Sequence, residues 1–346
     1  MPPLLEARHI RKVFSSGGGL FAEDKETVAV DDFTLTIDAD KPSFTTIAGE
    51  SGSGKTTIAR MLLGVIPPTE GQVLYAGRSL DELEKDEMRS FRQDVQAIFQ
   101  DPFEVYNPFY KVDHILTTPI EKFGLASSKS DAREQIDAAL RTVGLRPEET
   151  LGRYPHQLSG GQRQRITIAR ALLLKPKLII ADEPVSMVDA SLRATILASL
   201  HKLYREFDIS FVYITHDLTT AYQVSENIVV LYHGTVAEAG DVEQVIKDPQ
   251  HPYTRELIQS IPVPDPGSAW IEEEIEEKEV DESSAAASMQ GWSMCRYAPR
   301  CPHAMDKCST RPPLFRSGAG RAAACFLYDE QEPVEEGNLT QLFSEK

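Results

Sequence analysis

Residues 49–57 read Gly-Glu-Ser-Gly-Ser-Gly-Lys-Thr-Thr and separate a β-prone run at 43–48 from a helix-like run at 58–63. Glycines let the backbone approach an anion without a Cβ clash, and the N–H groups of a helix start attract phosphate. Strand, loop and helix in this order predict a phosphate-binding loop within a parallel α/β sheet. Its residues are Gly49, Glu50, Ser51, Gly52, Ser53, Gly54, Lys55, Thr56 and Thr57.

Two residues of this loop have distinct expected roles. Lys55 is expected to reach the β- and γ-phosphates of a bound nucleotide, and the Thr56 hydroxyl to ligate magnesium.

The run 177–184 is apolar, which is typical of a strand buried on both faces, and it ends in adjacent acids. Neighbouring residues of an extended chain point in opposite directions, so the two acids can act differently. We expect Asp182 to hold magnesium, and Glu183 to act as a general base or as an acceptor that orients the attacking water.

Two further strand-like runs end in polar side chains. The run 210–217 ends in His216, and the run 95–99 is followed by Gln100. Parallel strands bring their carboxyl ends to one edge of a sheet, where α/β proteins bind ligands. His216 is therefore interpreted as a γ-phosphate contact, although a lone histidine is more often structural. Gln100 is a candidate for magnesium or the attacking water, but its chemistry alone is a weak signal.

A second glycine-rich segment, Leu-Ser-Gly-Gly-Gln at 158–162, lies between the loop and the acidic strand. Ser159 is a good N-cap, Gly160 and Gly161 expose backbone N–H groups, and 163–174 reads as a helix before Pro176. A second phosphate cradle predicts that two copies clamp one nucleotide between them. Gln162 completes this segment.

Composition excludes some functions. The formal net charge, 36 minus 53 or −17, argues against a general nucleic-acid surface. The sequence contains no run of eighteen apolar residues and no signal-peptide pattern at its start. We therefore expect that this protein does not itself cross a membrane.

Six elements in this order resemble the ATP-binding cassette of ABC transporters. They are the 49–57 loop, Gln100-Asp101-Pro102, the 158–162 segment, 179–184, Ser186-Met187-Val188-Asp189, and 214–217. The resemblance implies a P-loop NTPase cassette with a RecA-like parallel sheet core, an N-terminal antiparallel β subdomain and a helical signature subdomain. The expected cassette spans 1–262, with the helical subdomain at about 101–165.

The resemblance also assigns residues. It implies a head-to-tail dimer in which each ATP lies between the loop of one subunit and Ser159-Gly160-Gly161 of the other. Asp189 would lie at the dimer interface. Many cassettes carry Ala-Leu where this chain has Met187-Val188, which affects fine coupling rather than hydrolysis.

Such cassettes stack adenine on an aromatic ring upstream of the loop. Phe14 is the candidate and Phe21 the runner-up, and a core role for either ring stays open.

The stretch 101–108 and the residues after it would, by the same resemblance, line a groove for a short helix of a membrane subunit. An ordered loop stiffened by prolines is the alternative. Substitution of Tyr106 or Phe109 is expected to uncouple transport while ATPase activity is kept.

All four cysteines fall near the end of the chain, with spacing C-x5-C-x6-C-x16-C. Together with 251–262, the region 291–346 resembles the C-terminal part of oligopeptide and dipeptide importer ATPases, some of which carry an iron–sulfur cluster. The expected ligands of a [4Fe–4S] cluster are Cys295, Cys301, Cys308 and Cys325; zinc and empty thiols remain alternatives.

An acidic stretch at 271–284 lies within 263–290, which is interpreted as a solvated linker between these two regions. A short helix that binds a basic partner is the alternative.

These observations predict the ATPase subunit of an ABC importer for oligopeptides or dipeptides. It would lie peripherally at the cytoplasmic face of the membrane. The expected partners are a second cassette, forming a heterodimer, two permease subunits and an extracytoplasmic substrate-binding protein. An oligosaccharide importer is the runner-up. A soluble ABC ATPase and a redox-sensing regulator are alternatives from other classes.

Overall fold

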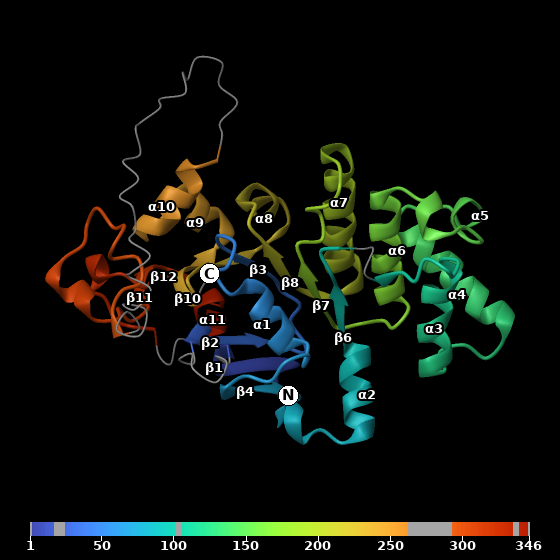
Figure 1. Cartoon of the computed structure of the whole chain (residues 1–346), viewed down its shortest axis with the longest axis horizontal. Coiled ribbons are helices and arrows are strands. Elements are labelled where there is room, and N and C mark those ends of the chain that lie inside the picture. Colours follow the sequence, from blue (N-terminus) through green and yellow to red (C-terminus); the bar gives the residue numbers. More distant parts are fainter. Residues whose placement is uncertain (1, 17–24, 102–104, 262–292, 335–338, 345–346) are drawn as a thin grey trace, which may run out of the picture.

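The computed structural model describes residues 2–16, 25–101, 105–261, 293–334 and 339–344. The chain forms two β-sheets, with helices on the main sheet and a group of helices at one end (Figure 1). Phe21, Pro102 to Glu104 and the predicted linker at 263–290 lie outside the described residues. Within the described ranges, no helix is both long enough and apolar enough to span a membrane.

The main sheet has eight strands in the order β11-β12-β10-β9-β3-β8-β7-β6. Its centre, from β9 to β6, is parallel, as predicted from the apolar runs. Every residue of β3, β8 and β9 is buried, because helices cover both faces of a parallel sheet. The strands are β3 (Phe44–Ala48), β6 (Val95–Ile98), β7 (Leu178–Asp182), β8 (Ser210–Thr215), β9 (Asn227–Tyr232), β10 (Thr235–Asp241), β11 (Phe315–Gly318) and β12 (Arg321–Ala323).

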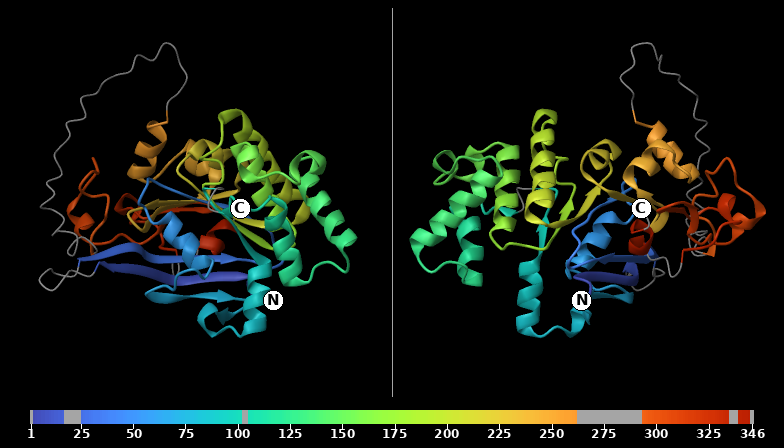
Figure 2. Two further views of the ribbon diagram at one scale, coloured as in Figure 1. Left: turned by 45° about the vertical axis from the view of Figure 1, so that its right-hand side comes forward. Right: turned by 180° about the vertical axis from the view of Figure 1, so that it is seen from behind.

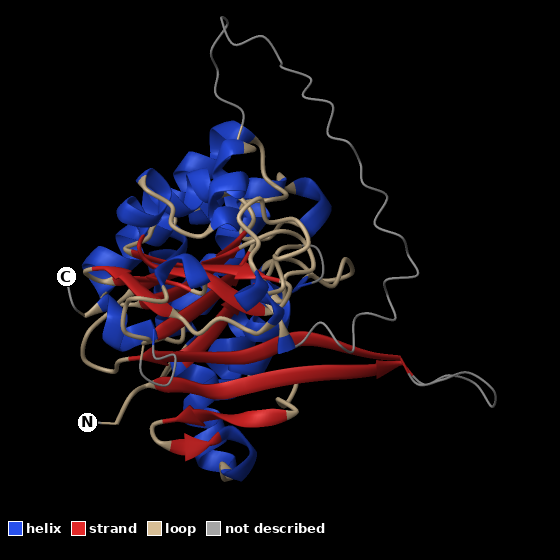
Figure 3. Cartoon of the chain, turned by 90° about the vertical axis from the view of Figure 1, so that its left-hand side faces the viewer, coloured by secondary structure: helices blue, strands red, loops and turns tan. Residues whose placement is uncertain are grey.

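The second sheet is antiparallel, with the order β2-β1-β4-β5. Figure 3 shows its two long strands running beside the main sheet. Side chains from both sheets share one core cluster with α1 (Lys55–Leu62), which fixes the start of that helix between the sheets. The strands are β1 (Leu5–Ser16), β2 (Lys25–Ile37), β4 (Glu70–Tyr75) and β5 (Arg78–Ser79), and α2 (Lys85–Asp94) leads into β6.

A helical group lies at the end of the molecule opposite β11 and β12 (Figures 1 and 2). Helix α4 begins after the N-cap Ser128, whose side chain accepts a hydrogen bond from the Asp131 N–H. The predicted helix at 163–174 is α6, which begins earlier because Gly160 and Gly161 occupy its first turn, and which ends at Leu172. The group consists of α3 (Asp113–Phe123), α4 (Lys129–Thr142), α5 (Pro147–Thr150) and α6 (Gly160–Leu172).

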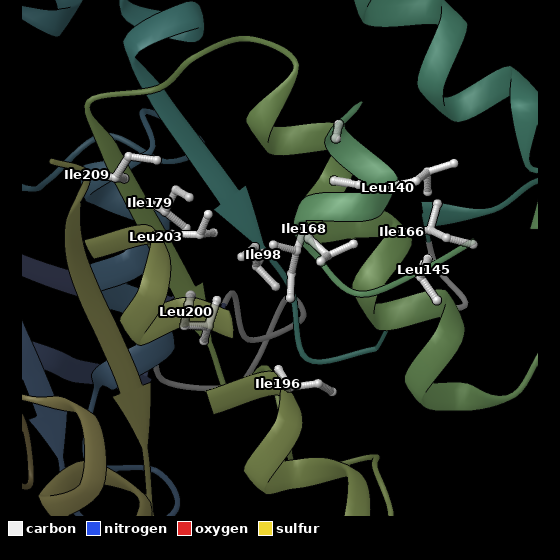
Figure 4. Packing of buried hydrophobic residues seen from close by; sticks show 14 of the residues in the cluster. Ile98, Leu140, Leu145, Ile166, Ile168, Ile179, Ile196, Leu200, Leu203 and Ile209 are labelled. Atoms are coloured by element: carbon white, nitrogen blue, oxygen red, sulfur yellow. The ribbon is translucent and has the colours of Figure 1, made fainter. Parts of the chain in front are cut away.

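A hydrophobic cluster joins this helical group to the main sheet. Figure 4 shows Ile98 and Ile179 of the sheet near Ile168 of α6 and Leu200 of α7. The glycine-rich segment 158–162, called the signature segment below, therefore lies at the start of a helix that packs directly against β6. After this group the chain forms the long helix α7 (Ala190–Phe207) and the shorter helices α8 (Leu218–Val224), α9 (Val242–Lys247) and α10 (Pro252–Gln259).

The C-terminal region extends the main sheet. Strand β12 pairs with β10, and β11 pairs with β12. The helix α11 (Leu339–Phe343) places Leu339 and Leu342 in the core cluster that also holds Ile47. The division into a 1–262 cassette and a 291–346 region stays a prediction, since the described part of the second shares the sheet of the first.

Candidate functional site

The phosphate loop connects β3 to α1, as predicted, and α1 begins at Lys55. Gly54 is the N-cap residue and has a φ of 101°, in the left-handed region. A Cβ at this position would lie 2.3 Å from the carbonyl oxygen of Ala29. Glycine is therefore required by both the backbone angle and the close approach of β2.

Lys55 lies buried within its own loop. Its Nζ donates hydrogen bonds to the carbonyl oxygens of Gly49 and Glu50, both at 2.7 Å. Burial lowers the pKa of Lys55, while the carboxylates of Glu183 and Asp182 act in the opposite direction. The loop thus holds a cationic side chain among its own carbonyls, a short distance from two acids.

Asp182 ends β7 beside the start of α1. The Thr56 hydroxyl donates to Asp182 Oδ1 at 3.4 Å. Burial raises the pKa of Asp182, and Glu183 raises it further, against the effects of Thr56 and Lys55. A hydroxyl and a carboxylate in contact are the hard oxygen donors that Mg²⁺ prefers, so these residues fit a magnesium ion.

Glu183 and His216 are joined by a contact that the sequence did not predict. His216 Nδ1 lies 2.9 Å from Glu183 Oε1, because β7 and β8 are adjacent and end together. The backbone of Glu183 has a φ of 45°, and its N–H donates to the carbonyl oxygen of Ile214 at 2.9 Å. A non-glycine residue in this region indicates that the surrounding structure holds the backbone of Glu183 in a strained conformation, and the contact with His216 orients its carboxylate.

The phosphate loop, Glu183 and His216 line one cleft of about 640 Å³. Asp182 lines an adjoining cavity of about 490 Å³, which shares Thr56 and Gln100 with that cleft. Gln100 reaches it from the end of β6, as the strand order requires. Ala29 of β2 and Leu257 of α10 also line it, and the sequence pattern carried no signal for either residue. The full lining is Ala29, Glu50, Ser51, Gly52, Gly54, Lys55, Thr56, Thr57, Gln100, Glu183, His216 and Leu257.

Phe14 is placed on β1 outside the lining of this cleft. Its side chain is 44 % exposed, and the Lys12 ammonium lies 5.4 Å from the ring centroid. The ring is therefore not part of the core. Its assignment to adenine binding stays a prediction.

The signature segment starts α6 with a reciprocal pair of hydrogen bonds. Ser159 Oγ accepts from the Gln162 N–H at 3.2 Å, and Gln162 Oε1 accepts from the Ser159 N–H at 2.9 Å. Ser159 is the predicted N-cap, whereas the capping role of Gln162 was missed, although serine followed three residues later by glutamine is a known signature of a helix start. None of residues 158–162 lines the cleft of its own chain.

Asp189 is exposed and stands at the N-cap of α7. Its backbone carbonyl accepts from Leu192 and Arg193, at 2.9 and 3.1 Å. The dimer-interface role of this residue stays a prediction.

The two aromatic residues of the predicted groove differ. Phe109 is 87 % exposed, in agreement with a docking role. Tyr106 is buried, and its hydroxyl donates to the carbonyl oxygen of Arg163 in α6 at 2.9 Å. Tyr106 is therefore part of the core under α6 and not of an exposed groove, and the expected effect of its substitution on transport and ATPase activity stays a prediction.

The four cysteines are free thiols that interact electrostatically with one another. Burial, reinforced by the other three thiols, raises the pKa of Cys325 to about 11. Among the described residues, no group of three or more His, Cys, Asp or Glu side chains forms a ready metal site. The metal prediction is therefore not supported by this geometry.

Known proteins share these features. The family described as "ABC transporter" matches residues 30–186, and the family described as "Oligopeptide/dipeptide transporter, C-terminal region" matches residues 237–308. A probable peptide ABC transporter ATP-binding protein, y4tS of Sinorhizobium fredii, is 40 % identical over 94 % of this chain and 90 % of its own length. The oligopeptide transport ATP-binding protein OppF of Salmonella typhimurium is 38 % identical over 82 % of this chain and 83 % of its own.

A solved structure gives the same result for the fold. The ATP-binding cassette MJ0796, dimeric in a post-hydrolysis state with ADP and Pi, is 28 % identical with a TM-score of 0.59. The match covers 69 % of this chain and 98 % of that one.

The fold and the cleft define a P-loop ATPase of the cassette type. The chain belongs to the family of ABC transporter ATP-binding proteins, within the oligopeptide/dipeptide class. It is the ATP-hydrolysing subunit of such an importer, and the comparisons favour this interpretation over an oligosaccharide importer or a soluble ATPase.

Proposed function

We propose that this chain binds ATP in the 640 Å³ cleft and hydrolyses it to drive peptide uptake through separate permease subunits. The observation that carries the proposal is the convergence of the phosphate loop and the Glu183–His216 pair on that cleft, with Asp182 held beside it by Thr56. The chain would act peripherally, at the cytoplasmic face of the membrane, with cargo delivered by an extracytoplasmic substrate-binding protein.

Each residue of the cleft has a proposed role. Lys55 and the loop N–H groups hold the phosphates. Thr56, Asp182 and Gln100 would hold Mg²⁺, which offsets phosphate charge when bound. Glu183 accepts a hydrogen bond, and then a proton, from the attacking water. His216 fixes the direction of Glu183 and contacts the γ-phosphate.

The other wall of each ATP site belongs to a second cassette in this proposal. Residues 158–162 are absent from the lining of their own cleft, although they form the start of a helix, a place where backbone N–H groups bind phosphate. A second cassette, related but not identical, would present the same helix start to this cleft, with Asp189 at the interface. Phe14 would stack on adenine.

Glu183→Gln tests hydrolysis and assembly together. The amide keeps the shape of the side chain but cannot accept a proton, so turnover is expected to fall at least about a hundredfold while ATP binding is retained. In this background, a Ser159→Cys copy and a Gly52→Cys copy, with the native cysteines replaced, should crosslink when MgATP saturates the protein. If the functional pair is a heterodimer, the second cysteine is placed at the matching position of the copurified cassette.

Ser128→Cys supplies the matched control, because Ser128 also caps an exposed helix of the same helical group. It should not crosslink to Gly52→Cys. Near-normal turnover of Glu183→Gln would remove that residue from catalysis, and equal crosslinking by both serine positions would contradict the proposed dimer.

Phe109 is proposed to contact a permease subunit. Phe109→Ala should lower peptide uptake in reconstituted vesicles while basal ATPase activity is kept, because the ring is exposed and is not part of the cleft lining. Equal loss of both activities would contradict a docking role.

The four thiols are proposed as ligands of a [4Fe–4S] cluster. Each neighbouring thiol disfavours the charged form of Cys325, so a cationic centre that binds these four soft donors would favour their thiolate forms. The described geometry does not fit a preformed site, so metal binding has to draw the thiols together. Anaerobic purification with a visible spectrum and assays for iron and zinc distinguishes a cluster from zinc and from empty thiols.

A further inference from the structure

The segment from Cys295 to Cys301 is a compact turn packed against α10. Its backbone is closed by hydrogen bonds from Ala298 to Cys295 at 3.1 Å and from Cys301 to Ala298 at 3.3 Å. Tyr297 is buried in its centre, with its ring centroid 5.8 Å from that of Tyr253. The turn and the start of α10 therefore form one packed unit.

This unit contacts the phosphate loop at Glu50. The buried Tyr253 hydroxyl accepts a hydrogen bond from the Glu50 N–H at 3.1 Å. Arg300 Nη1 lies 3.7 Å from Glu50 Oε2, and Arg300 Nη2 pairs with Glu256 of α10. The carbonyl of Glu50 in turn accepts from Lys55 Nζ, so the position of Glu50 bears directly on the phosphate-binding cation.

A second route reaches the loop at Ser53. Arg296 is mostly buried, donates to the carbonyl of His233, and pairs with Asp31 at 3.2 Å. The adjacent Gly234 donates its N–H to the Ser53 carbonyl at 2.9 Å. The two arginines of the turn thus contact or support two separate residues of the 49–57 loop.

We infer that Arg300 is a positioning residue for nucleotide binding, through which the Cys295–Cys301 turn braces the phosphate loop. Arg300 is not among the residues that line the cleft, so it acts through Glu50 rather than on the nucleotide. A change in the conformation of the turn, from whatever its thiols bind, would then change ATP affinity. The inference rests on the proposed assignment of the cleft to ATP.

The expected effect is modest because the pair is accessible to solvent. The Arg300 and Glu50 side chains are 44 % and 43 % exposed. Exposed ion pairs contribute little, so loss of this one should weaken ATP binding about two- to fivefold. The effect should fall on KM and leave kcat unchanged, since Glu183 and His216 are untouched.

The test is a double-mutant cycle in the full-length protein. MgATP affinity is measured by titration with a fluorescent ATP analogue, and kcat and KM by phosphate release, for wild type, Arg300→Gln, Glu50→Gln and the double variant. Thermal unfolding verifies that each variant is folded. Lys307→Gln is the matched control, because it removes an exposed cation of the same region that pairs with Asp329 and not with the loop.

Arg300→Gln should raise the dissociation constant for MgATP and the KM, whereas Lys307→Gln should change neither. The double variant should bind MgATP about as well as whichever single variant, Arg300→Gln or Glu50→Gln, binds it less tightly. Arg300→Lys should recover part of the affinity. Unchanged affinity of a folded Arg300→Gln protein, or fully additive effects in the double variant, would overturn the inference. A wild-type protein that fails to bind MgATP would overturn the proposed function itself.

Discussion

The two glycine-rich segments look alike in the sequence but use glycine for different physical reasons. In the phosphate loop, Gly52 and Gly54 have φ angles of 81° and 101°, which other residues rarely adopt. Gly160 and Gly161 lie in the first turn of α6, with ordinary helical backbone. Gly161 instead leaves space, because a Cβ there would lie 2.7 Å from Leu192 Cδ1 of α7.

The two segments are also stabilised by hydrogen bonds that span different distances along the chain. The start of α6 is capped within four residues by Ser159 and Gln162. The phosphate loop is held by distant parts of the chain, through Tyr253 and Gly234. A local device can be read from neighbouring residues, whereas a loop braced from several elements depends on the assembled fold.

Gly54→Ala should give the largest effect. The added Cβ meets a backbone oxygen at 2.3 Å and the φ angle is strained, so the free energy of unfolding should fall by about 3 kcal/mol or more, with ATP binding lost. Urea unfolding and nucleotide titration measure both.

Gly52→Ala is the matched control for that change. It carries a similar φ strain, but no atom lies within 4 Å of the added Cβ. Its cost should stay near 1 kcal/mol. Equal losses in the two variants would show that backbone angle alone, and not the approach of β2, requires glycine at position 54.

Gly161→Ala should have an intermediate effect. The clash is with the end of a leucine side chain, which can shift, so we expect a loss of about 2 kcal/mol in unfolding free energy. Gly160→Ala meets only Met187 O at 3.6 Å and should be neutral or slightly stabilising, because alanine favours helix. The comparison is made by urea unfolding without nucleotide, and equal costs would contradict the packing role of Gly161.

His251→Asn should give the smallest effect and reports on the distant support of the loop. His251 caps α10 through its ring Nδ1, and burial lowers its pKa to about 4. The unfolded chain takes up a proton near pH 6.5. The stability contributed by neutral His251 is thus present above pH 6.5 and is lost as pH falls toward 4.

Asparagine keeps a capping oxygen but does not titrate. Between pH 8 and 5.5 the wild type should therefore lose about 1.4 kcal/mol more unfolding free energy than His251→Asn. Burial raises the pKa of Glu238 to about 7, so its contribution to the free energy of unfolding falls as pH rises. This change is the same in both proteins. Parallel pH profiles would show that His251 is not held neutral in the folded state.

Much of the fold could be predicted because its signals are local. The buried strand runs 178–182 and 210–215 and the Ser159 cap each follow from side-chain pattern over a few residues. The convergence of Lys55, Gln100 and Glu183 on one cleft, with Asp182 beside it, followed from a single rule, that parallel strands end at one edge.

What the sequence by itself determined is therefore the chemistry of the ATP site and the class of protein. Only the tertiary structure decided that His216 pairs with Glu183 and that Tyr106 is buried under α6. It also decided that the cysteine-bearing region adds strands to the edge of the main sheet and braces the phosphate loop through Arg300. Motifs encode contacts between near neighbours, whereas these contacts join residues far apart in the chain, and their partners are set by strand order and packing.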